Sequence, residues 1–261
     1  MKRILVPTDF SEQAENALKV AAQLAKKNES EIYVLNSLEL PTHLSSSGAN
    51  GAMPESLFFI KLAEKYFEEL LEKPYLEGLL IHEAIIGHGE VYKDVNEVVK
   101  EKNIDLVIMG SQGTNGFMEL FIGSNTEKVV RTSEIPVLVI KNNHEDFKTD
   151  NFVYATDFSE ECKIPFNQAK KFAEGTNTHI NLLYINTPSE FKTTKEINTK
   201  IRSFIRDMDD SNFSVHIYND ISIEKGILNF ASETNANLIG MGTHGRRGLA
   251  HFFNGSVSKD L

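Results

Sequence analysis

The sequence predicts an α/β protein of two tandem domains, each a doubly wound parallel sheet, with the second sheet lacking its last strand. Three observations lead to this prediction: a strand-end motif that occurs twice, a glycine pattern that occurs twice, and a regular alternation of apolar runs with amphipathic segments. Short apolar runs that alternate with amphipathic segments are typical of parallel strands covered by helices on both faces.

The repeat is visible in two pairs of segments. Residues 4–11 read ILVPTDFS and residues 152–159 read FVYATDFS, an offset of 157 − 9 = 148. Residues 105–113 read DLVIMGSQG and residues 237–245 read NLIGMGTHG, an offset of 242 − 110 = 132. The second copy is therefore shorter in its middle, and we assign the difference to the Ser-, Gly- and Pro-rich segment 41–54.

In the first copy, β-branched apolar runs predict strands at 3–8, 31–38, 79–86, 104–110 and 135–140. Amphipathic segments between them predict helices over 11–27, 55–73, 90–102 and 124–133. Ser11 is the expected N-cap of the first helix, because a serine hydroxyl can accept a hydrogen bond from the free amides of the first turn.

The second copy repeats this order. Strands are expected at 151–156, 179–185, 213–219 and 237–242, and helices over 159–174, 195–209 and 222–235. The polar run 142–150 separates a domain at 1–145 from one at 150–261. Ile140 maps to 140 + 132 = 272, beyond Leu261, so we expect five strands in the first sheet and four in the second. Strand 135–140, left without its counterpart, is then an edge through which chains can associate.

Composition excludes several classes of protein. The net charge of −10 argues against nonspecific binding to nucleic acid or to membrane surfaces. No apolar run is long enough for a transmembrane helix, and the apolar stretch near the N-terminus is too short for a secretory signal. The single cysteine, Cys162, excludes an internal disulfide and a cysteine-based zinc site. We therefore expect a cytoplasmic protein.

The glycine pattern is the strongest chemical signal. In each copy a strand ends on a glycine, a second glycine follows, and after nine intervening residues a Gly-Ser pair opens a helix: Gly110, Gly113 and Gly123-Ser124, then Gly242, Gly245 and Gly255-Ser256. Glycines let the backbone approach a ligand closely, and free amides at a helix start favour an anion. The pattern predicts a phosphate site in each copy.

Thr8-Asp9 and Thr156-Asp157 also end strands. Ligands of open parallel sheets bind at the carboxyl ends of the strands, where the strand order reverses. We therefore expect these residues to face the same crevice as the glycines, where a carboxylate can accept hydrogen bonds from a ribose or from an adenine amino group.

With the pattern G-x2-G-x9-G-[S/T] and with P-T-D-x-S near its N-terminus, the sequence resembles the universal stress proteins in their tandem form. This resemblance covers nearly the whole chain. The pattern is typical of the branch that binds adenine nucleotides. The resemblance implies Rossmann-like domains similar to the adenine nucleotide alpha-hydrolases, a role in the stress response, and bound ATP, ADP or AMP with Mg²⁺ or Mn²⁺ on the phosphates. It also implies a pseudo-dimer within the chain, a homodimer as a further possible assembly, and a protein partner that the sequence does not identify.

The same resemblance assigns roles to individual residues. Asp9 and Asp157 would contact the nucleoside, with Pro7, Thr8, Ala155 and Thr156 beside them. Ser37 and Ile185 would line the adenine pocket. Ribose and phosphates would be held by Met109, Gly110, Gly113, Gly123, Ser124 and Thr126 in one copy and by Met241, Gly242, Gly245, Gly255, Ser256 and Ser258 in the other.

The two copies depart from each other within the motif. Ala155 replaces the proline of the first copy, and Gln112 stands where the second copy has His244. Arg246 and Arg247 give the second phosphate loop a positive charge that the first lacks. We therefore expect the second site to bind a triphosphate more tightly than the first.

Two other functions remain as alternatives. An enzyme of this fold would catalyse slow ATP hydrolysis or nucleotidyl transfer, but the sequence supplies no clear general base and no Walker A loop, so we assign no catalytic residue. A receiver-type phosphoacceptor at Asp9 or Asp157 would need an acidic cluster and a later lysine at strand ends, which the sequence does not supply convincingly. His43, His82, His88 and His144 are scattered and form no metal-binding spacing, so we expect no protein-held metal.

Overall fold

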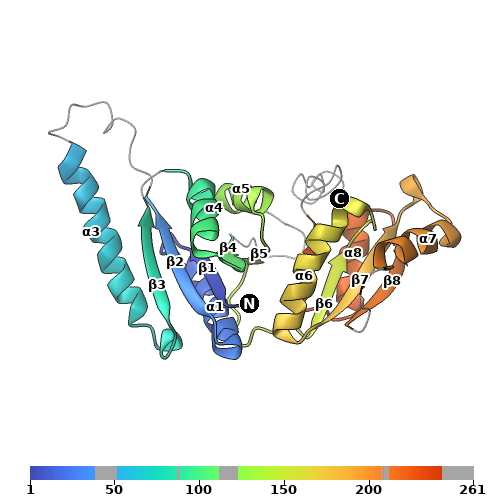
Figure 1. The fold of residues 1–261 in the computed structure, drawn as a ribbon, viewed down its shortest axis with the longest axis horizontal. Coiled ribbons are helices and arrows are strands. Elements are labelled where there is room, and N and C mark those ends of the chain that lie inside the picture. The colour runs from blue at the N-terminus through green and yellow to red at the C-terminus, as the bar shows by residue number, and fades with distance from the viewer. Residues whose placement is uncertain (39–51, 87–88, 112–122, 207, 209–211, 243–261) are drawn as a thin grey trace, which may run out of the picture. The chain divides into compact units, whose positions relative to one another are not determined.

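The computed structural model describes residues 1–38, 52–86, 89–111, 123–206, 208 and 212–242, with the backbone alone at 52–56 and 84–86 (Figure 1). The chain divides into two compact units; unit 1 runs to Phe147 and unit 2 starts at Lys148. No helix of the described ranges is both long enough and apolar enough to cross a bilayer.

Unit 1 contains a five-stranded parallel sheet in the order β3-β2-β1-β4-β5. Its strands are β1 (Arg3–Pro7), β2 (Glu31–Ser37), β3 (Ile81–Ile86), β4 (Leu106–Gly110) and β5 (Val137–Ile140). Its helices are α1 (Glu12–Asn28), α3 (Ala52–Leu71), α4 (Val91–Lys102) and α5 (Ser124–Thr132), with a 3-10 turn at Pro74–Leu76. The strand order reverses between β1 and β4, so a ligand of this sheet is expected at the carboxyl ends of these two strands.

Both faces of this sheet are buried, as a parallel sheet requires. Leu5 and Val107 point to the face covered by α4 and α5, where they form a core with Val95 and Val129. Ile4 and Val6 are also fully buried, and alternation along the strand turns them to the opposite face, where α1 contacts β1 and β4. The predicted doubly wound architecture is confirmed in unit 1.

Unit 2 contains a four-stranded parallel sheet in the order β8-β7-β6-β9 among the residues described. Its strands are β6 (Asn151–Ala155), β7 (His179–Asn186), β8 (Phe213–Asn219) and β9 (Leu238–Met241). Its helices are α6 (Lys163–Thr176), α7 (Thr194–Ile205) and α8 (Ile223–Glu233), with 3-10 turns at Glu160–Cys162 and Pro188–Glu190. The sheet has the four strands expected, and β6 and β9 take the places that β1 and β4 take in unit 1.

The first helix of unit 2 differs from the prediction of a continuous helix over 159–174. In unit 1 the hydroxyl of Ser11 accepts a hydrogen bond from the Ala14 amide, and α1 starts at the next residue. In unit 2 a 3-10 turn follows Ser159 and α6 starts only at Lys163. The cause is Pro165, which has no N–H to donate and is tolerated only in the first turn of a helix.

Candidate nucleotide site at the strand ends

The Thr-Asp-Phe-Ser motif of unit 1 forms a compact turn at the carboxyl end of β1. The amide of Thr8 donates to the carbonyl of Leu35 at 2.8 Å and extends the pairing with β2. The hydroxyl of Thr8 accepts from the Phe10 amide at 2.9 Å, and a carboxylate oxygen of Asp9 accepts from the Ser11 amide at 3.0 Å. These bonds fix the exposed Asp9 side chain beside the switch point.

Unit 2 repeats this turn bond for bond at the end of β6. The Thr156 amide donates to the Leu183 carbonyl at 2.9 Å, and the Thr156 hydroxyl accepts from the Phe158 amide at 3.1 Å. Asp157 accepts from the Ser159 amide at 2.9 Å. The sequence repeat is therefore also a repeat of local geometry, and it presents one carboxylate at the same point of each sheet.

Each turn contains a phenylalanine in the left-handed region of the backbone, with φ of 61° at Phe10 and 57° at Phe158. Such a conformation costs of order 1 kcal/mol in a residue with a Cβ. Packing holds it in place: the ring centroids of Phe10 and Phe67 are 5.2 Å apart, and those of Phe158 and Phe204 are 5.3 Å apart. The two turns are strained at the same residue and anchored by the same kind of aromatic contact.

The glycines of the first motif have different structural roles. A Cβ on Gly110, at the end of β4, would lie 2.2 Å from the carbonyl oxygen of Gln13 and 3.0 Å from the amide nitrogen of Ala14. Gly110 therefore allows β4 to approach the start of α1. Gly123 is the N-cap of α5, and a Cβ added to it would meet no atom within 4 Å, so its backbone borders open space.

Helix α5 is fastened to β4 by a residue that the sequence assigned to phosphate binding. The buried hydroxyl of Thr126 donates to the Gly110 carbonyl at 3.1 Å. This bond fastens the first turn of α5 to the end of β4, and Ser124 is the exposed first residue of the helix. Met109, also predicted at the site, is buried in the core below, as is Pro7.

Two polar side chains at this edge are buried with an atom that has no hydrogen-bond partner, and neither was predicted at the site. The Asn36 side-chain amide donates to the Thr8 carbonyl at 2.8 Å, but its oxygen has no partner. The hydroxyl of Ser111, the residue after Gly110, also has none. Leaving such a group unpaired costs about 1–3 kcal/mol. The available sequence signal was an asparagine that directly follows the apolar residues Val34 and Leu35 near the end of β2.

The predicted adenine-pocket residues lie in different surroundings in the two units. Ser37, the last residue of β2, donates a hydrogen bond to Asp94, a fully buried carboxylate in the first turn of α4. Ile185 packs in the core with α8, where a Cβ on Gly226 would meet it at 2.7 Å. The position predicted to contact adenine is therefore polar in unit 1 and apolar in unit 2.

Unit 2 surrounds its aspartate with two side chains that unit 1 lacks. The Cys162 thiol lies 3.3 Å from Asp157 Oδ1 and 3.4 Å from the Ser159 hydroxyl, and Lys200 of α7 reaches the Asp157 carbonyl at 3.4 Å. Burial alone would raise the pKa of Asp157, but the hydrogen bonds from Ser159 and Cys162 and the charge of Lys200 outweigh it and lower the pKa. Burial raises the pKa of the Cys162 thiol, so its place near a helix start does not make it a reactive thiolate.

The end of β9 is less tightly packed than the end of β4. A Cβ on Gly242 would lie 3.3 Å from the Pro165 side chain and 3.7 Å from the Tyr154 hydroxyl, which is buried without a hydrogen-bond partner. Met241 and Ala155, both predicted at the site, are partly buried and pack against the core of unit 2. Outside the described residues lie Gly113, Gly245, Gly255, Ser256 and Ser258, together with Gln112, His244, Arg246 and Arg247.

Unit 2 also has a groove at the carboxyl edge of its sheet, away from the predicted nucleotide contacts. It lies at the ends of β7 and β8, and its lining includes the exposed side chains of Phe191 and Ile221 together with Asn186 and Asn219. Its lining contains none of the predicted contacts, so it is adjacent to the β6–β9 crevice but separate from it.

Comparison with known proteins supports the predicted fold and the predicted family resemblance. The profile of the universal stress protein family matches residues 1–141 and 213–261. A universal stress protein of Methanocaldococcus jannaschii is 34% identical over 159 residues, which cover 55% of this chain and 96% of that protein. One from Bacillus subtilis is 29% identical over 147 residues, covering 53% and 98%. Among solved structures, a universal stress protein from Archaeoglobus fulgidus has a TM-score of 0.71 at 22% identity, covering 92% of this chain and 86% of that one.

Proposed function

Because the chain belongs to the universal stress protein family, we propose that each of its units binds one adenine nucleotide in its strand-end crevice. The nucleotide is ATP or its product ADP or AMP, with Mg²⁺ or Mn²⁺ carried by the phosphates. The protein then acts as a nucleotide-dependent regulator of the stress response and not as a dedicated catalyst.

The observation that carries this proposal is the duplicated Thr-Asp-Phe-Ser turn. It places an Asp carboxylate at the switch point of each sheet by the same backbone bonds. In unit 1 the crevice also has a glycine-capped helix start and buried polar atoms at Asn36 and Ser111 that lack partners. A nucleotide offers what these groups need: hydroxyl and amino donors for oxygen acceptors, and phosphate oxygens for hydroxyl and amide donors.

Calorimetric titration of the full chain with ATP and Mg²⁺ tests the proposal, with mass spectrometry of nucleotide released from the purified protein. We expect a stoichiometry of two, reduced to one by Asp9→Ala or by Asp157→Ala and to zero by both together. Asp150→Ala, which removes an exposed carboxylate outside the crevices, is the matched control and should leave both sites intact. No heat and no copurified nucleotide in the wild type would refute the proposal.

Whether the protein also hydrolyses the bound ATP is tested by a separate assay. No described side chain at either crevice stands out as a general base, which favours binding over turnover. Release of inorganic phosphate from ATP with Mg²⁺, compared with the Asp9→Ala and Asp157→Ala double variant, distinguishes a regulator from a slow ATPase. A rate that falls with this variant would establish an enzyme.

A further inference from the structure

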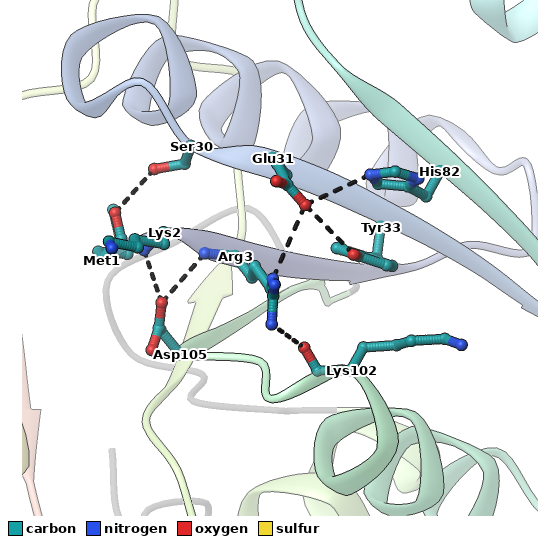
Figure 2. Close-up of polar contacts among 9 residues, drawn as sticks. All are labelled: Met1, Lys2, Arg3, Ser30, Glu31, Tyr33, His82, Lys102 and Asp105. Carbon is teal, nitrogen blue, oxygen red and sulfur yellow. Dashed lines mark hydrogen bonds and ion pairs between the residues drawn. The ribbon is translucent and has the colours of Figure 1, made fainter.

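The amino-terminal ends of the two sheets carry polar clusters at equivalent positions. In unit 1, Figure 2 shows Glu31 at the centre of such a cluster: Arg3 Nε lies 3.7 Å, His82 Nε2 3.4 Å and the Tyr33 hydroxyl 3.2 Å from its Oε2. The strand register pairs Arg3 with Glu31 and Tyr33 with His82. These four side chains therefore lie on one face of the sheet, with an acid balanced by a fixed cation.

In unit 2 the same register pairs Asn151 with His179 and Asn181 with Ser214. Asn151 thus occupies the position that Arg3 has in unit 1, and His179 occupies the position of Glu31. His216, two residues after Ser214 on β8, joins them on the same face. We call His179, Asn181, Ser214 and His216 the imidazole cluster. It lies at the opposite end of the strands from the crevice described above.

The atoms of the imidazole cluster converge. Ser214 Oγ lies 3.1 Å from His179 Nε2, 3.0 Å from His216 Nε2 and 3.2 Å from Asn181 Oδ1, and His216 Nε2 is 3.0 Å from Asn181 Oδ1. Four of the six distances among these four atoms are therefore 3.0–3.2 Å. In a tetrahedral zinc site with bonds of about 2.0–2.2 Å, the ligand atoms lie roughly 3.3–3.6 Å apart. Ser214 Oγ, His216 Nε2 and Asn181 Oδ1 contact one another at slightly shorter spacings than these, and His179 Nε2 contacts Ser214 Oγ, so the cluster would expand to hold an ion.

We propose that the imidazole cluster binds a divalent transition-metal ion of the Zn²⁺ class. His179 Nε2, His216 Nε2 and Asn181 Oδ1 are its ligands, and the Ser214 hydroxyl is the fourth. Imidazole suits Zn²⁺, Cu²⁺ and Ni²⁺, whereas Mg²⁺ and Ca²⁺ prefer oxygen ligands alone. Within the described ranges no three His, Cys, Asp or Glu side chains form a metal-binding group, so this donor set depends on an amide and a hydroxyl oxygen.

Surrounding contacts orient the ligands. The Asn181 amide nitrogen donates to Asn151 Oδ1 at 2.7 Å, which turns Asn181 Oδ1 toward the imidazoles. Asn151 is itself held by a bond to the Thr234 carbonyl. The His216 ring rests on Phe230 with 5.1 Å between centroids, while His179 is exposed and gives an ion access from solvent. Partners of this kind typically contribute about 10–100-fold to metal affinity.

The test is a Zn²⁺ titration of the nucleotide-free, metal-stripped full chain, by competition with a chromogenic chelator and by ¹⁵N NMR of the imidazoles. We expect Zn²⁺ to shift Nε2 of His179 and His216. His179→Gln, at an exposed position, should weaken this binding at least tenfold and remove its thermal stabilisation. Asn151→Arg, which installs the cation of unit 1, should also weaken it, whereas His82→Gln should leave it unchanged.

Circular dichroism of each variant confirms that it is folded before its affinity is interpreted. The proposal is overturned if Zn²⁺ does not bind, if it shifts only other imidazoles, or if His179→Gln binds Zn²⁺ as the wild type does. An equal loss in His82→Gln would also overturn it, because that result would place the ion in unit 1.

Discussion

Individual residues of the glycine motif serve folding and ligand binding to different degrees. Gly110 is required by the contact of β4 with the backbone of Gln13, whether or not a ligand binds. Gly123 has open space around it, and its φ of −57° is accessible to any residue. The motif therefore combines one glycine needed for packing with one whose small size matters only if something occupies the crevice.

A pair of alanine substitutions separates these roles. Gly110→Ala should lower the free energy of unfolding by about 1–3 kcal/mol, because the new Cβ collides with backbone that cannot rotate away. Gly123→Ala should change it by no more than about 0.5 kcal/mol. Urea unfolding followed by circular dichroism measures both, and equal effects would contradict the assignment.

The lowered pKa of Asp157 predicts how its contribution to stability depends on pH. A carboxyl whose pKa is lower in the folded state stabilises that state above its unfolded pKa, and this stabilisation disappears as the pH falls through the folded pKa. Asp157→Asn should therefore be less stable than the wild type at neutral pH, with a difference that shrinks in acid. Thermal unfolding between neutral pH and about pH 3 measures it, and a difference that grows in acid would show the opposite sign.

Secondary-structure elements were predicted well where the local sequence pattern alone determines them, without contacts from other elements. The buried strands and the amphipathic helices fall close to their predicted positions, because alternation and 3.6-residue periodicity are properties of the sequence. The start of α6 differs from the predicted helix over 159–174 because Pro165 is confined to the first turn of a helix. The contacts of Asn36 with Thr8 and of Lys200 with Asp157 could not be predicted, since each joins separate elements.

Removing that proline tests the explanation at the level of the helix. Pro165→Ala restores an N–H that can donate to the Glu161 carbonyl, so α6 should extend by about one turn toward Ser159. Backbone ¹³C chemical shifts at Glu160–Cys162 report the change, with Ala173→Gly, in the buried last turn of the same helix, as a control that alters α6 without altering its start. Unchanged shifts at these three residues would assign the delayed start to another cause.

At the scale of the whole molecule, the chain has separate hydrophobic cores. The clusters around Phe166 and around Val153 draw only on unit 2, and the cluster around Leu5 draws only on unit 1. Each unit therefore has the buried apolar surface from which a domain obtains its own stability.

Core truncations should act on one unit at a time. Phe166→Ala removes a fully buried ring and should cost about 3–5 kcal/mol, lowering the hydrogen-exchange protection of β6 and β7 but not of β1 and β2. Phe67→Ala, at a ring equally buried in unit 1, should produce the reverse pattern. Mass spectrometry of peptides from each unit measures both, and loss of protection in both units from one substitution would show that they unfold together.

Because β1 lies between β2 and β4 in the sheet, one of its two partners is synthesised soon after it and the other much later. Arg3 pairs with Glu31, 31 − 3 = 28 residues later, but Ile4 must wait for Leu106, 106 − 4 = 102 residues later. At about 5–20 residues per second, the ribosome takes roughly 4–15 s to add the 106 − 31 = 75 residues that lead from Glu31 to Leu106. One side of a strand destined for the core stays open during that interval. In unit 2, Phe152 of β6 likewise precedes its partner Leu238 of β9 by 238 − 152 = 86 residues. Each half of the nascent chain therefore has its own period in which an unpaired central strand is exposed to chaperones and to premature association.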